Sequence, residues 1–122
     1  MTQESLVRIV VTGGRGFSDR ELLAKTLDNY SIAELAQGGA SGADRLAKEW
    51  AKANNTPVVT FEADWKQFGY AAGPMRNLQM LKDFAPDLVV AFPGGSGTAD
   101  CVRKARQLGF LVVVVKQTDT DC

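Results

Sequence analysis

The sequence predicts a single small α/β domain, in which a doubly wound, mainly parallel sheet of about five strands carries helices on both faces. Short apolar runs alternate with helical patterns along the whole chain. The runs are continuously apolar, which is typical of strands that are buried on both faces. Several of them end in a glycine-rich loop that leads into a helix. With 122 residues and 45% hydrophobic composition, residues 1–122 have the size of one domain.

The N-terminal half contains two units of strand, glycine loop and helix. A β-rich apolar run at 6–12 stops at a glycine loop, after which Ser18 or Asp19 can cap a helix. The apolar positions of that helix recur at helical spacing: Leu22, Leu23, Leu27 and Tyr30. A weaker strand pattern at 32–37 ends in a second glycine loop, and a helix is expected at 43–54. Its apolar face comprises Leu46, Ala47, Trp50 and Ala51.

The C-terminal half continues the alternation. A third strand contains Val58, Val59 and Phe61, and the polar and aromatic stretch 63–73 is interpreted as a loop. Pro74 suits the first turn of a helix that ends before Pro86. Its predicted apolar stripe is Met75, Leu78, Met80, Leu81 and Phe84. A strand at 88–92, a helix from 98 to about 108 with Gly109 as its cap, and a strand at 110–115 complete the domain. The tail 116–122 is expected to be frayed.

Charge and cysteine content limit the possible functions. Fourteen basic residues balance fourteen acidic ones, so no overall field favours nucleic acid or an anionic membrane. Without histidine and with two cysteines, the chain excludes a structural zinc site and a histidine-based triad, and it predicts no cofactor. A carboxylate-bound magnesium ion stays open. Cys101 and Cys122 are expected to be free thiols, and the lack of a signal peptide or membrane-length run predicts a cytoplasmic protein.

The stretch 88–100 carries the strongest candidate site. An apolar strand breaks at a proline, passes three closely spaced glycines and resumes as a helix near Thr98. Free amides at a helix start, with the helix dipole behind them, suit a phosphate or carboxylate. The predicted anion cradle is Pro93, Gly94, Gly95, Ser96, Gly97 and Thr98. The spacing matches neither a Walker loop nor the dinucleotide fingerprint, and a tight structural turn is the alternative.

A second glycine stretch at 38–45 echoes this pattern. Each stretch places an aspartate, Asp44 or Asp100, in the expected first turn of its helix. In a doubly wound sheet, ligands bind beyond the carboxyl ends of the strands where the winding reverses. If the strands at 6–12 and 88–92 are neighbours there, the loops at Gly13 and Gly94 face each other.

Several side chains could carry chemistry. Arg15, set among glycines, is a candidate phosphate clamp, and a solvated loop arginine is the alternative. Arg76 and Asn77 are expected in a first helical turn, where a cation indicates an anionic partner; a surface pair fits equally well.

The aspartates and aromatics also have two interpretations. Asp44 and Asp100 could bind ribose hydroxyls or act in acid–base chemistry, but helix stabilisation is favoured for Asp44 and stays open for Asp100. Trp65 could stack on a base. Covering a core edge is the common role of such aromatics and the one favoured for Phe68. Cys101 lacks a histidine partner for nucleophilic catalysis.

Taken together, five ordered motifs at 11–15, 38–45, 64–65, 72–77 and 92–100 resemble the YspA-type, cpYpsA-related branch of the SLOG superfamily. The resemblance implies a Rossmann-like fold, a site for a nucleotide-derived small molecule, frequent homo-oligomerisation, and links to conflict between phages and bacteria. The ligand-binding residues it implies, together with the motifs above, are Gly13, Gly14, Arg15, Gly39, Ser41, Asp44, Trp65, Arg76, Asn77, Pro93, Gly94, Gly95, Ser96, Gly97, Thr98 and Asp100.

The wider superfamily includes phosphoribohydrolases with the motif Pro-Gly-Gly-x-Gly-Thr-x-x-Glu. The chain matches this motif at 93–98, but Cys101 stands at the glutamate position and Asp100 lies one residue earlier. Their helix motif of arginine, lysine and a later methionine is matched by Arg76, Asn77 and Met80. Ligand binding without turnover is therefore the leading interpretation. The alternative is a nucleotide N-glycoside hydrolase that uses Asp100 and Arg76. Nucleic-acid binding, by similarity to the DNA-processing protein DprA, is disfavoured by the balanced charge.

Overall fold

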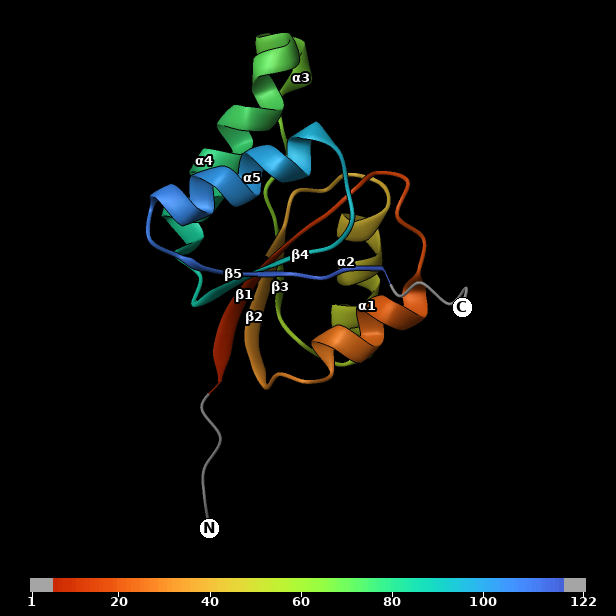
Figure 1. The fold of residues 1–122 in the computed structure, drawn as a ribbon. Coiled ribbons are helices and arrows are strands. Elements are labelled where there is room, and N and C mark those ends of the chain that lie inside the picture. The colour runs from red at the N-terminus through yellow and green to blue at the C-terminus, as the bar shows by residue number, and fades with distance from the viewer. Residues whose placement is uncertain (1–5, 118–122) are drawn as a thin grey trace.

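The computed structural model describes residues 6–117, in which five parallel strands form one sheet in the order β3-β2-β1-β4-β5 (Figure 1). Because β1 lies between β2 and β4, the chain winds outward in one direction and then crosses to the other side of β1. The predicted doubly wound α/β fold is confirmed, and the winding reverses between β1 and β4. The strands are β1 (Val7–Thr12), β2 (Ile32–Gln37), β3 (Val58–Thr60), β4 (Leu88–Ala91) and β5 (Leu111–Val114).

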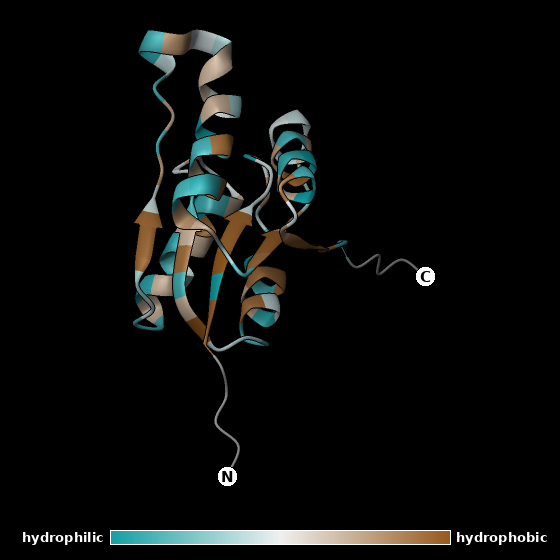
Figure 2. Cartoon of the chain, turned by 90° about the vertical axis from the view of Figure 1, so that its left-hand side faces the viewer, coloured by the Kyte–Doolittle hydropathy of each residue, from teal (hydrophilic) through white to brown (hydrophobic). Residues whose placement is uncertain are grey.

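Helices cover both faces of this sheet and divide the interior into two cores. On one face, α1 (Arg20–Leu27) and α2 (Ala43–Ala53) pack against Ile9 and Val11 of β1. On the other, α4 (Ala72–Phe84) and α5 (Ser96–Gln107) pack against Val10. Successive strand residues point to opposite faces, so a strand buried on both must be apolar throughout. Figure 2 shows the strands coloured mostly hydrophobic; Leu111, Val113 and Val114 of the edge strand β5 are nevertheless exposed.

The first two helices form as their sequences predict. Of the two candidate caps of α1, Asp19 is the N-cap, and its carboxylate accepts a 3.0 Å hydrogen bond from the Leu22 amide. All the apolar positions expected in these two helices except Ala51 are in or against the core on this face, and Ala51 is fully buried. Tyr30 packs there from beyond the end of α1 at Leu27.

The segment 63–73 was expected to be a loop, and that prediction is wrong. It forms the short helix α3 (Trp65–Phe68), a 3-10 turn (Gly69–Ala71) and the start of α4 at Ala72. Asp64 starts α3 by accepting a 3.1 Å hydrogen bond from the Gln67 amide, a local cap that the loop interpretation overlooked. Together α3 and the 3-10 turn form the tip at the top of Figure 1.

The early start of α4 changes two further predictions. Arg76 lies one turn inside the helix and not in its first turn. The apolar stripe is also shifted: Met75 is 47% exposed, whereas Asn77 is buried. Residues 73, 77, 80, 81 and 84 follow the helical period, so the buried face includes a polar side chain that hydrophobicity alone assigns to the surface.

The fifth helix also begins earlier than expected. It starts at Ser96 with Gly95 as its N-cap, so Asp100 lies in the second turn, whereas Asp44 lies in the first turn of α2 as predicted. The glycine-rich residues were interpreted as loop, but a glycine inside a helix costs only about 1 kcal/mol. Of the predicted frayed tail, residues 118–122, including Cys122, lie outside the described part of the chain. None of the helices within 6–117 is long and apolar enough to cross a membrane.

Candidate functional site

Three glycine loops meet at the carboxyl ends of β1, β2 and β4. The Gly14 amide donates a 2.9 Å hydrogen bond to the Pro93 carbonyl, and the Ala43 amide donates one of 3.1 Å to the Gly14 carbonyl. A Cβ atom on Gly42 would lie 2.2 Å from the Gly14 oxygen, and one on Gly94 would lie 2.6 Å from the Gly14 nitrogen. These two glycines are therefore required by the packing of the loops against each other. The predicted proximity of the first and fourth strand loops is confirmed.

A cavity of about 780 Å³ opens beside these loops, a volume within the usual range for small-molecule sites. It brings together most of the predicted ligand-binding residues, which come from the loop after β1, the first turn of α2, α3, α4, and the start of α5 with its N-cap. Those that line it are Gly13, Gly14, Arg15, Asp44, Trp65, Arg76, Asn77, Gly95, Ser96, Gly97, Thr98 and Asp100.

Four predicted residues lie outside this cavity. Pro93 and Gly94 line a second cavity of about 600 Å³, on the side of α1. Gly39 lines a third of about 340 Å³, beside Trp65 and Arg76. Ser41 lines none of the three, and its hydroxyl instead donates a 3.3 Å hydrogen bond to the Arg15 carbonyl.

The N-terminus of α5 opens into the main cavity. This twelve-residue helix has no side-chain cap, because its N-cap is Gly95. The amides of the first turn, at 96–98, have no carbonyl one turn earlier within the helix to accept from them. A Cβ atom on Gly95 or Gly97 would meet nothing within 4 Å, so the approach to these amides is open. Such a helix start is suited to an anion.

A line of hydrogen bonds connects α4 to α5 along the cavity wall. The Arg76 Nε donates to Asn77 Oδ1 at 3.0 Å. The Asn77 Nδ2 donates to Asp100 Oδ2 at 3.0 Å and to the Gly97 carbonyl at 3.2 Å. Arg76 also donates through Nη1 to the carbonyls of Gly38 and Phe61. These hydrogen bonds satisfy the buried Asn77 amide, and they hold the Arg76 guanidinium and the Asp100 carboxylate in place.

Asp100 is held as a carboxylate anion. Arg103 donates to its Oδ1 at 2.6 Å, and Lys104 donates to its Oδ2 at 3.0 Å. Partial burial favours a higher pKa, but the hydrogen bonds from Asn77 and Lys104 and the charges of Lys104 and Arg103 together lower the pKa of Asp100 below its usual value. The group is suited to accept hydrogen bonds and not to donate a proton.

Asp44 has the opposite character. Its side chain is in the first turn of α2, is 6% exposed, and accepts a 3.2 Å hydrogen bond from the Ala40 amide. Burial raises the pKa of Asp44; backbone hydrogen bonds and the charges of Arg76 and Arg15 oppose that shift without cancelling it. One cavity is therefore lined by two carboxyl groups whose pKa values shift in opposite directions, upward for Asp44 and downward for Asp100.

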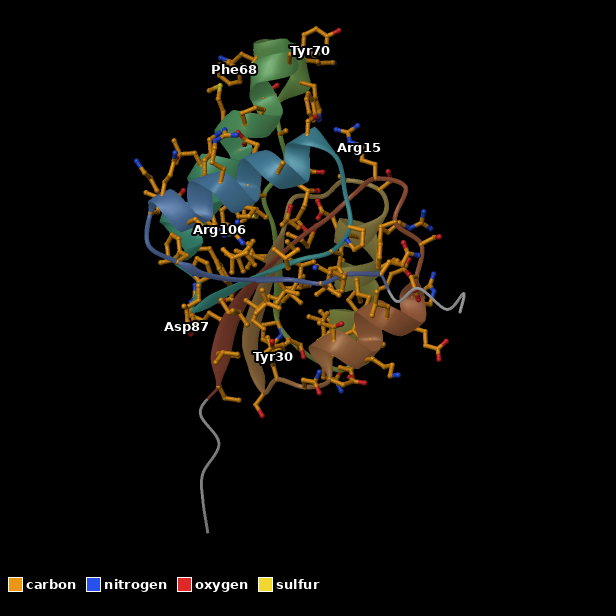
Figure 3. All side chains as sticks on the ribbon, in the orientation of Figure 1. Arg15, Tyr30, Phe68, Tyr70, Asp87 and Arg106 are labelled. Atoms are coloured by element: carbon orange, nitrogen blue, oxygen red, sulfur yellow. The ribbon has the colours of Figure 1, made fainter. Side chains whose placement is uncertain are left out.

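Arg15 and Trp65 form a cation–π pair at the wall of the main cavity. The Arg15 guanidinium carbon lies 5.1 Å from the centroid of the Trp65 ring, a cation–π contact. Arg15 lines all three cavities, and Trp65 lines the main and the third. The expectation that Phe68 covers a core edge is wrong: it is 41% exposed and belongs to neither core. Figure 3 shows it on the tip with Tyr70, above Arg15.

Several site residues were missed from the sequence. Gln37 is fully buried; its Nε2 donates to Thr60 Oγ1 at 2.6 Å, and its Oε1 accepts from the Gly39 amide at 2.7 Å, which positions the β2 loop. A polar residue at the end of an apolar strand was the available signal. Lys104 and Arg103 were missed because only their helical spacing from Asp100 connects them to the site.

Cys101 lies in the core behind the cavity wall. It is fully buried among the residues that pack α4 and α5 on the sheet, and burial raises the pKa of its thiol to about 11. The thiol is protonated at neutral pH, which supports the expectation that it is no nucleophile. Within residues 6–117, no group of three or more acidic or cysteine side chains could hold a metal ion.

Comparisons with known proteins identify the family of this chain. The family described as YspA, cpYpsA-related SLOG matches residues 7–68, about half of the chain. The Gene 61 protein of Mycobacterium phage D29 is 37% identical over 120 residues, an alignment that covers 87% of this chain and 94% of the phage protein. These two matches show that the chain belongs to the YspA, cpYpsA-related SLOG family.

Proposed function

We propose that this protein binds a nucleotide or a nucleotide-derived small molecule in the main cavity, in order to sense or sequester it. The observation that carries this proposal is the uncapped N-terminus of α5, which opens into a cavity of about 780 Å³. Membership of the family makes a nucleotide-derived ligand the expected class.

The charges around the cavity support one orientation of such a ligand. Its phosphate would accept hydrogen bonds from the first-turn amides of α5, near the cations Arg15 and Arg76. Asp100, an anion fixed by Asn77 and Lys104, would accept hydrogen bonds from ribose hydroxyls. The anionic phosphate and the neutral ribose would thus contact different parts of the cavity wall.

Native mass spectrometry of the purified protein tests this proposal first. An intact nucleotide derivative, recovered by denaturation and chromatography, would support binding and name the ligand class. If no ligand copurifies, the protein is offered a nucleotide extract and then a panel of nucleoside phosphates in calorimetric titrations. Failure to bind any member would reject the proposal.

A second candidate function, hydrolysis of an N-glycosidic bond, is favoured by the two carboxyl groups with opposite pKa shifts. Asp44 would donate its proton to the departing base, and the Asp100 anion would stabilise positive charge developing at the sugar C1′. The C1′–N bond would break, a water molecule would add to C1′, and the proton released by that water would return to the Asp44 carboxylate, leaving free base and ribose phosphate.

Chromatography of nucleotides incubated with the protein distinguishes the two functions. Release of base faster than in a protein-free control would support hydrolysis. Loss of that release with retained binding in Asp100→Asn or Asp44→Asn would assign the roles. Recovery of intact nucleotide only would reject hydrolysis.

The expected homo-oligomer, the cytoplasmic location, the absence of nucleic-acid binding and the link to phage–bacteria conflict stay predictions. Light scattering after gel filtration tests the oligomeric state.

A further inference from the structure

We infer that the indole face of Trp65 is the nucleobase subsite of the cavity, and that the Arg15 guanidinium stacked on it is the group that a base displaces. This inference rests on the proposed function and deepens it, because it adds the base to the phosphate and ribose contacts. A planar, uncharged aromatic group is the ligand chemistry that such a face recognises.

Trp65 is not explained as a packing residue. The largest aromatic side chain type in the chain stands here 47% exposed, outside both hydrophobic cores. Its ring lies against Gly73 of α4, where a Cβ atom would be only 3.1 Å from Trp65 Cη2. Asp64 caps the helix that carries it. The indole therefore packs against Gly73 and is held at a wall shared by the main and third cavities.

Arg15 is placed so that it can leave the indole. Its neighbour Gly16 has open space around it, and the Arg15 side chain is exposed. Arg15 also lines the second cavity together with Gly95, the N-cap of α5. An exposed cation–π contact is weak compared with the stacking of a base on an aromatic ring. Arg15 displaced by a base would remain near enough to approach the phosphate.

The other exposed aromatics of the tip do not share this arrangement. Phe68 is on the same short helix but lines none of the three cavities. Tyr70 lines the main cavity but is fully exposed, so its ring is not held against a neighbouring residue as the indole is held against Gly73. Phe68 is therefore a matched control for Trp65.

Tryptophan fluorescence gives a direct test. The chain has two tryptophans. Trp50 packs against the core under α1 and α2 and lines none of the three cavities, so Trp50→Phe leaves Trp65 as the single reporter. Nucleoside 5′-monophosphates should quench or shift its emission on binding. Ribose 5-phosphate should bind about tenfold or more weakly, because it lacks the base, and should leave the emission nearly unchanged.

Calorimetric titration of two variants completes the test. Trp65→Leu should weaken nucleoside monophosphates by about tenfold or more and leave ribose 5-phosphate unaffected, with partial recovery in Trp65→Phe. Phe68→Leu should leave both affinities unchanged. Equal effects of Trp65→Leu on both probes, or none, would overturn the base subsite while the proposed function stands. If no probe binds the unmodified protein, the proposed function fails as well. If Trp65→Leu does not fold, the fluorescence experiment decides: Trp65 emission in Trp50→Phe that does not change when a nucleotide binds would overturn the base subsite.

Discussion

The side-chain amide of Asn77 donates a 3.0 Å hydrogen bond to the carboxylate of Asp100, and this contact joins α4 to α5 at the wall of the cavity. The same amide group accepts from Arg76, so a cation on one helix and an anion on the other are oriented by one buried side chain. Neither charged group needs to rearrange before a ligand arrives, which favours binding.

Replacement of this amide should destabilise the fold. Asn77→Leu removes the acceptor of Arg76 Nε and one of the two donors to Asp100 Oδ2, the other being Lys104. It should lower the free energy of unfolding by about 1–3 kcal/mol. Urea denaturation measures the change. Gln79→Leu, at an exposed position of the same helix, should change stability by less than about 0.5 kcal/mol. Equal stability of the two variants would show that the hydrogen bonds from Arg76 through Asn77 to Asp100 contribute nothing to stability.

Asp100 should make the protein sensitive to acid. Its pKa is lower in the folded state than the ordinary value of 3.8, so the unfolded chain binds more protons in that range. The stabilising contribution is complete above the unfolded pKa and is lost as pH falls through the folded one. The stability difference between wild type and Asp100→Asn should therefore shrink below about pH 4. A difference that stays constant on acidification would contradict the assignment.

Asp44 should show the opposite pH dependence. Its pKa is raised in the folded state, so its contribution is greatest below the unfolded pKa of 3.8 and is lost as pH rises through the folded value. Asp44→Asn, whose amide oxygen can still accept from Ala40, should become more stable relative to wild type as pH increases. Urea unfolding at a series of pH values measures this, and the reverse trend would exclude a raised pKa.

The α5 N-terminus can be blocked without loss of the helix. Gly97→Asp places a carboxylate in open space in the first helical turn, where it interacts favourably with the dipole but repels an anionic ligand. We expect unchanged or higher thermal stability and a loss of nucleotide affinity of at least about tenfold. Gly97→Ala is the control, and its nucleotide affinity should stay close to that of the wild type. Retained affinity in Gly97→Asp would place the phosphate elsewhere.

The loop junction should not tolerate a side chain at Gly42. This residue has φ of +76°, and a Cβ atom would lie 2.2 Å from the Gly14 oxygen. Gly42→Ala should cost more than about 2 kcal/mol of stability in denaturant titrations. Gly16→Ala, with nothing within 4 Å and no positive φ, should be nearly neutral. A mild effect at Gly42 would mean that the loops can separate.

The sequence alone determined the layers of this protein. Continuously apolar runs and glycine loops predict buried parallel strands, and Asp19 caps α1 as expected, because such signals act between residues close in the chain. The glycine motif at 93–98 likewise predicted a helix start after the fourth strand. Local signals failed at 63–73, where short helices lack enough periodicity to be recognised.

Tertiary structure alone decided the directions of the polar side chains. Residues 100 and 101 differ by about 100° around a helix, and the packing of α5 on the sheet turns Asp100 to the cavity and Cys101 to the core. The burial of Asn77, the stacking of Arg15 on Trp65 and the opposite pKa shifts of Asp44 and Asp100 arise in the same way. Each depends on the docking of elements distant in sequence, and local patterns carry no information about that docking.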